Sequence, residues 1–168
     1  MKILSDYSFL ELQSCLARFP KFRAKQVFDA IIQGKDYHET TLPKTMIEEL
    51  KQDYILKPIE IFRVLVSSDG TKKYLLKLHD DNIVECVFLK QNYGNTICMS
   101  TQVGCRMGCK FCASTLNGLV RNLTAGEMLS TIAVVNADNG KNTERNFSNI
   151  VLMGSGEPFD NYANVVKW

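Results

Sequence analysis

A strand–helix–strand pattern between residues 95 and 154 constrains the fold of this chain more than any other feature. An apolar run, NTICMST, precedes a helical segment that begins with a capping-box pair, Thr124 and Glu127, and continues to about Asn136. A second apolar run, SNIVLMG, follows that helix. A strand, a helix and another strand in this order predict a βαβ unit with a parallel sheet. Such sheets bind ligands at the C-terminal ends of their strands.

Three cysteines follow the first of these strands with the spacing C-x3-C-x2-C: Cys105, Cys109 and Cys112. A structural zinc site uses four protein ligands, so three thiols leave one coordination position open for another molecule. Two alternatives stay open on the residues alone. Cys98, on the preceding strand, could complete a four-thiolate zinc site, although this arrangement is unlike a zinc knuckle, or the thiols could be unliganded.

Composition is that of a folded protein: the 168 residues are 45% hydrophobic and 23% charged. No apolar run approaches the roughly 20 residues that a membrane span needs, and acidic residues come too early for a signal peptide. We therefore predict a cytoplasmic protein. In that compartment cysteines more often bind metal or catalyse than form disulfides, and the chain has six, namely Cys15, Cys86, Cys98, Cys105, Cys109 and Cys112.

The net charge is only +2, but the charges are unevenly distributed. No acidic residue lies between Glu85 and Glu127, whereas four basic residues do, namely Lys90, Arg106, Lys110 and Arg121. Such a stretch suits an anionic cofactor or a phosphate backbone. A second basic group near the N-terminus is interleaved with aromatic residues and predicts either RNA contact or a solvated helix edge: Arg18, Lys21, Arg23 and Lys25 with Phe19 and Phe22.

The rest of the chain divides by its hydrophobic period. Residues 7–57 carry three apolar stripes with helical spacing and predict three helices that pack on one another. Residues 58–93 alternate as strands do, with turns at Asp69-Gly70 and Asp80-Asp81-Asn82, and predict an antiparallel meander. The βαβ unit then occupies residues 94–168. We predict the α/β fold class.

Several segments together resemble the RlmN/Cfr family of radical S-adenosylmethionine (SAM) RNA methyltransferases. These are the cysteine segment SxQVGCxMGCxFCAST, the strand end Gly-Ser-Gly-Glu-Pro, and the upstream DGTKKYLLKL, VECV, FRAKQVFDAI and LPK runs. The resemblance covers nearly the whole chain and, through the Gly-Glu-Pro ending, is closer to the RlmN type. It implies an RNA-binding-like helical accessory domain at 1–57, a small antiparallel β linker at 58–93, and the first part of a partial radical SAM (β/α) barrel at 94–168.

The resemblance also implies cofactors and roles for individual residues. Cys105, Cys109 and Cys112 would bind a [4Fe–4S] cluster, and Phe111, Gly156 and Glu157 would belong to the SAM site. Glu85, which on sequence alone is an ordinary outward-facing strand residue, would accept a proton from the adenine. Cys98 would be the resolving cysteine that forms a transient disulfide bond.

The implied reaction transfers a methyl group to C2 of adenine in 23S rRNA and tRNA, through a methylated cysteine and a 5′-deoxyadenosyl radical. A flavodoxin or ferredoxin would supply electrons to a monomeric enzyme that needs no membrane. The methyl-carrying cysteine would lie beyond Trp168, so we expect these residues alone to be inactive. A zinc-clamped RNA-binding module without catalysis, and a radical SAM enzyme acting on another substrate, are the competing hypotheses.

Overall fold

The N-terminal part of the protein is a small helical unit. The structure is a computed structural model that describes residues 1–140 and 146–168. Three helices follow one another, as predicted: α1 (Phe9–Cys15), α2 (Phe22–Ile32) and α3 (Lys44–Asp53). Their apolar stripes form one core, and a short parallel pair, β1 (Lys2–Ile3) with β2 (Tyr54–Ile55), joins the two ends of the unit.

A mixed sheet forms the second part of the protein, in the order β3-β4-β5-β6-β9. The meander is confirmed, since β3 (Ile59–Val66), β4 (Lys72–Leu78) and β5 (Ile83–Leu89) pair antiparallel. β6 (Thr96–Met99) pairs antiparallel with β5 and parallel with β9 (Asn149–Val151). One sheet therefore runs through the predicted boundary between residues 93 and 94.

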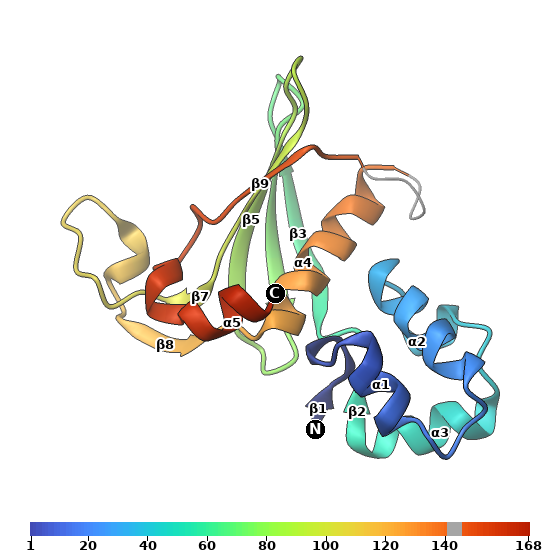
Figure 1. The fold of residues 1–168 in the computed structure, drawn as a ribbon. Helices are drawn as coiled ribbons and strands as arrows, with labels where there is room; N and C mark the ends of the chain where they lie inside the picture. Colours follow the sequence, from blue (N-terminus) through green and yellow to red (C-terminus); the bar gives the residue numbers. More distant parts are fainter. Residues whose placement is uncertain (141–145) are drawn as a thin grey trace.

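Helix α4 (Ala125–Asp138) is the crossover of the predicted βαβ unit and covers one face of the sheet (Figure 1). The predicted capping box is present, because the Thr124 side chain accepts from the Glu127 amide and the Glu127 side chain accepts from the Thr124 amide. Buried side chains from both layers form the core between them, among them Tyr74, Leu76, Val84, Cys86, Phe88, Ile97, Met99, Met128 and Val135.

The helical unit is docked on α4 by close backbone contact. The Asp6 carboxylate accepts a hydrogen bond from the Gly126 amide at 2.7 Å, and the Ser5 hydroxyl donates to the Gly126 carbonyl at 3.0 Å. A Cβ atom at Gly126 would lie 2.5 Å from the Asp6 nitrogen. Only glycine therefore allows the short 3-10 turn η1 (Leu4–Asp6) to approach the first turn of α4 this closely.

A hairpin that the sequence did not predict carries the cysteines. β7 (Gln102–Gly104) pairs antiparallel with β8 (Leu119–Asn122), and the cysteine loop, residues 105–118, connects them. Figure 1 shows this loop extending from the sheet on the side away from α2. After β9 the chain forms η4 (Pro158–Asn161) and α5 (Tyr162–Lys167).

The α/β fold class is confirmed. Within the described residues, no helix is both long enough and apolar enough to cross a bilayer. Part of the predicted polar connection between α4 and β9, residues 141–145, lies outside the described residues.

Candidate functional site: the cysteine loop and the strand end beside it

The cysteine loop is held at its base by backbone contacts. Gly104 has a φ of +73°, and a Cβ atom there would lie 2.0 Å from the Gly118 carbonyl oxygen. The Cys105 amide donates to that same carbonyl at 3.0 Å. Cys105 is consequently buried at the foot of the loop, whereas Cys109 is exposed and Cys112 is half-buried. The Cys112 amide donates to the Cys109 carbonyl at 3.0 Å, which places these two residues in one turn.

The three thiols have the right chemistry for a soft metal or an iron–sulfur cluster, because thiolates are the ligands that such groups prefer. In the described part of the chain, however, no three His, Cys, Asp or Glu side chains are gathered closely enough to hold a metal ion. The residue types fit a cluster, and the exposed tip of the loop leaves room for rearrangement. The assignment of Cys105, Cys109 and Cys112 as ligands stays a prediction.

The Gly-Ser-Gly-Glu-Pro segment folds against the strand that leads into the cysteine loop. The Ser155 carbonyl accepts from the Thr101 amide at 2.9 Å, and the Glu157 amide donates to the Gln102 side-chain oxygen at 2.9 Å. Gly156 has a φ of +102°, and a Cβ atom there would lie 2.6 Å from the Gln102 Cβ. The Glu157 carboxylate accepts from the Phe159 amide at 3.0 Å and so caps η4. Gly156 is thus required by the close approach of two backbones.

The cysteine loop and this strand end meet directly. The hydroxyls of Ser114, just after the last cysteine, and Ser155 lie 3.1 Å apart. The fold therefore brings together the two segments that the sequence singled out as cluster and cofactor sites. Phe111 is 94% exposed at the tip of the loop, and its predicted role in the cofactor site stays a prediction.

Glu85 and Cys98 lie on the face of the sheet opposite α4. Their neighbours Val84, Cys86 and Met99 are buried on the helix side, and successive strand residues point to opposite faces. Glu85 is exposed, as predicted, and its carboxylate forms an ion pair with Lys73 at 2.7 Å. Burial raises the pKa of the Cys98 thiol, and a hydrogen bond with the Met153 backbone offsets part of this rise.

The predicted disulfide at Cys98 is not found. All six cysteines lie among the described residues, and each is a free thiol. Cys86 is on the neighbouring strand, but it pairs with Met99 and therefore faces α4, whereas Cys98 pairs with Val87 and faces the other way. Two cysteines whose Cβ atoms point to opposite faces of a sheet cannot be bridged.

In the folded protein, carboxylates from other segments lie beside the basic residues of the stretch between Glu85 and Glu127. Arg106 is paired with Asp160, and Arg121 is paired with Asp80 and Glu127. Two of the four cations that suggested an anion-binding surface are thus neutralised by carboxylates from other segments. Lys110 forms no ion pair within the described residues and stays an exposed charge beside Cys109.

The N-terminal basic group is also largely paired. Arg18 contacts Glu49 at 3.4 Å, and Lys25 contacts Asp29 at 3.0 Å. Arg23 lies over the exposed ring of Phe22, 4.6 Å from its centroid, which leaves one cation–aromatic pair that could stack on a base.

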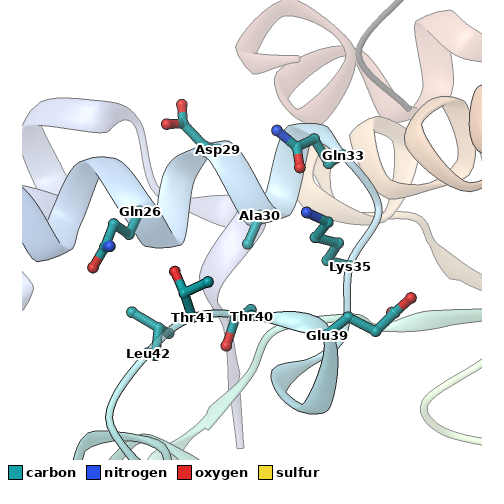
Figure 2. A pocket seen from close by; sticks show the side chains of 9 residues that line it. All are labelled: Gln26, Asp29, Ala30, Gln33, Lys35, Glu39, Thr40, Thr41 and Leu42. Atoms are coloured by element: carbon teal, nitrogen blue, oxygen red, sulfur yellow. The ribbon is translucent and has the colours of Figure 1, made fainter. Parts of the chain in front are cut away.

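A hollow of about 190 Å³ lies in the same helical unit, between the end of α2 and the segment leading to α3. Figure 2 shows the nine side chains around it, with Asp29 pointing away from the segment that carries Thr40 and Thr41. Asp29 is paired with Lys25, Glu39 accepts from the Asp36 amide, and Thr40 donates to the Tyr37 carbonyl. These three polar side chains of the hollow therefore stabilise the local fold.

Two features of the site had no signal in the sequence pattern. The first is the buried side chain of Gln102, which forms three hydrogen bonds, one to β8 and two to the strand end. The second is a buried network in which Arg121 donates two hydrogen bonds of 2.8 Å to Glu127, a residue with no exposed surface. The capping box predicted Glu127 as a helix-start residue but not as the partner of an arginine.

Comparisons with known proteins agree on one family. No family model matches the chain. The protein named probable dual-specificity RNA methyltransferase RlmN from Clostridium perfringens (strain SM101) is 48% identical over 174 residues, covering 100% of this chain and 49% of that protein. Its namesake from Clostridium acetobutylicum is 46% identical over 173 residues, with the same coverage. The chain spans about half the length of the curated relatives it matches.

A solved structure agrees with these relatives. The crystal structure of a radical SAM methyltransferase from Sphaerobacter thermophilus superposes with a TM-score of 0.90 at 37% identity. The match covers 99% of this chain and 50% of that one. Over its whole length the chain is therefore similar to the N-terminal half of proteins named RlmN and of a solved radical SAM methyltransferase.

Proposed function

We propose that this chain forms the cluster-binding and SAM-binding part of a radical SAM RNA methyltransferase that methylates C2 of adenine in 23S rRNA and tRNA. The observation that carries the proposal is the contact between the cysteine loop and the Gly-Ser-Gly-Glu-Pro strand end, made by Ser114 and Ser155. The RNA methyltransferase name of the relatives supports the reaction class.

Cys105, Cys109 and Cys112 would hold a [4Fe–4S] cluster with one iron left for SAM. When bound, the cluster and SAM supply a 5′-deoxyadenosyl radical. The glycine at 156 keeps the backbone beside Gln102 free of side-chain atoms, and the Glu157 carboxylate can accept hydrogen bonds from an ammonium group. Phe111, on the exposed tip between two ligands, would cover the cofactor.

Glu85 would act as the base that takes a proton from the adenine. It is exposed, lies on the face of the sheet that α4 leaves uncovered, and forms an ion pair with Lys73 at 2.7 Å. Cys98 presents a half-buried thiol on the same face. A base and a thiol on one face of the sheet, next to the strand end, can both serve a nucleotide bound there.

The proposal places the protein in the cytoplasm with rRNA and tRNA as partners and a flavodoxin or ferredoxin as electron donor. The test expresses the full product of the gene that encodes this chain in a bacterium lacking the modification, and analyses digested RNA by mass spectrometry. We expect 2-methyladenosine with the natural protein, its loss with E85Q, and its retention with E60Q, an exposed carboxylate on the edge strand β3. RNA without 2-methyladenosine, or with 8-methyladenosine, would contradict the proposal.

A further inference from the structure

The side chain of Gln102 joins three segments around the base of the cysteine loop. It has no exposed surface. Its amide nitrogen donates to the Asn122 side chain on β8 at 2.8 Å and to the Asp160 carboxylate on η4 at 2.9 Å. Its oxygen accepts from the Glu157 amide at 2.9 Å. All three hydrogen bonds are buried or partly buried, so Asp160 is held in place from the protein side.

From the loop side, Arg106 reaches the same carboxylate. Arg106 lies between Cys105 and Cys109, and its guanidinium donates to the second oxygen of Asp160. Its side chain is 62% exposed, whereas that of Asp160 is only 13% exposed. The contact therefore joins an exposed arginine of the loop to a largely buried carboxylate of the strand end.

We infer that Arg106 and Asp160 are positioning residues that fix the cysteine loop against the Gly-Ser-Gly-Glu-Pro strand end. The inference rests on the proposed function, because it assigns the pair the task of setting the distance between cluster and SAM sites. Gln102 is the anchor that keeps Asp160 oriented. In the described structure, one further side-chain hydrogen bond joins the two segments, between Ser114 and Ser155.

The expected free energies distinguish a role in positioning the cysteine loop from a role in the global stability of the fold. The arginine of this ion pair is 62% exposed, and such a pair contributes little to global stability, so R106Q should leave the unfolding midpoint almost unchanged. The loop, by contrast, is tied to the strand end by few contacts, and local opening is sensitive to each of them. The pair should therefore control loop opening rather than folding.

The first test measures amide hydrogen exchange across residues 105–118 in the metal-free chain. We expect R106Q and D160N each to accelerate exchange about 2–5-fold, and the double variant to do no more than either single one. K110Q is the matched control, since it removes a charge from the same loop that has no ion pair in the described structure. Exchange in R106Q equal to that in K110Q, or additive effects in the double variant, would overturn the inference.

The second test uses the same variants in the full gene product after anaerobic reconstitution. Iron content should be unchanged, because the three thiols remain, while the dissociation constant for SAM rises several-fold in R106Q and D160N but not in K110Q. Unchanged SAM affinity despite faster loop exchange would reduce the pair to a structural contact and overturn the positioning role. If the protein binds no iron, the proposed function fails, and the exchange experiment still decides whether the pair holds the loop.

Discussion

The two ends of the β7–β8 hairpin are built on opposite principles. At its base, Arg121 is bound by the fully buried Glu127 and by Asp80 at 2.7 Å. The Gln102 side chain forms three hydrogen bonds there, to Asn122, Asp160 and Glu157. At its tip, Cys109 and Phe111 are exposed, and Lys110 forms no ion pair within the described residues. The contrast indicates a rigid frame that presents an adaptable loop, which suits the proposal that the three thiols rearrange to ligate a metal centre.

The largest expected effect is at the base. The substitution E127Q keeps the shape of the side chain but leaves the half-buried Arg121 with a single carboxylate partner. Breaking a fully buried ion pair costs about 3–5 kcal/mol, and because Arg121 is 27% exposed and keeps Asp80 we expect the lower end, about 3 kcal/mol, in the free energy of unfolding. Urea denaturation followed by circular dichroism measures it. K110Q at the tip should change the same quantity by less than about 0.5 kcal/mol, and equal effects would remove the contrast.

Two glycines, one at the base of the hairpin and one near its tip, differ in how tightly their surroundings are packed. Gly104 and Gly108 have similar φ values, +73° and +71°, but a Cβ atom at Gly104 would collide with the Gly118 carbonyl whereas one at Gly108 meets nothing within 4 Å. We expect G108A to cost about 1 kcal/mol, the penalty for the left-handed backbone, and G104A to cost about 3 kcal/mol. Equal costs in urea denaturation would show that the foot of the loop is not tightly packed.

Lowering the pH should destabilise the base of the β7–β8 hairpin, because Asp80 becomes protonated. Hydrogen bonds from Arg121 hold the pKa of the Asp80 carboxyl well below its ordinary value. The ionised form thus stabilises the fold above the unfolded-state pKa of about 4, and this stabilisation is lost as the pH falls below it. D80N should lower the free energy of unfolding by about 1–2 kcal/mol at pH 7, and by progressively less as the pH falls from about 4 toward the lowered folded-state pKa. A difference that stays constant with pH would contradict this.

The cysteines should react in the order of their exposure. With iodoacetamide at pH 8, followed by mass spectrometry of the peptides, Cys109 should be modified first. Cys98 should follow slowly, because burial raises the pKa of its thiol, and Cys86, whose thiol pKa burial also raises, should react only on unfolding. Early modification of Cys86 would mean that the core beneath α4 opens readily.

Local patterns were enough to predict the helices, the meander and the βαβ unit, because apolar period, turn residues and the capping box at Thr124 are short-range signals. The same reasoning placed Glu85 on an exposed strand position. It could not predict the β7–β8 hairpin, whose strands are short and flank a long loop. Nor could it foresee that Arg106 and Arg121 meet acids from distant segments, since such pairing depends on the tertiary fold.

The site was predicted less completely than the fold. The juxtaposition of the cysteine loop and the Gly-Ser-Gly-Glu-Pro end follows from the parallel pairing of β6 with β9, so it could be expected from the βαβ pattern. The anchoring role of Gln102 could not be expected from the sequence, because a glutamine before a cysteine motif has no distinctive spacing. The transient disulfide at Cys98 is not supported, since all six cysteines are free thiols and the partner implied for Cys98 would lie beyond Trp168.

The central claim is that the cysteine loop holds an iron–sulfur cluster, and metal analysis after anaerobic reconstitution tests it most directly. The account predicts bound iron and acid-labile sulfide with broad visible absorbance, abolished by C105A, C109A or C112A and retained in C98A. A colourless protein with stoichiometric zinc that also requires Cys98 would contradict the account and support a zinc-clamped binding module instead.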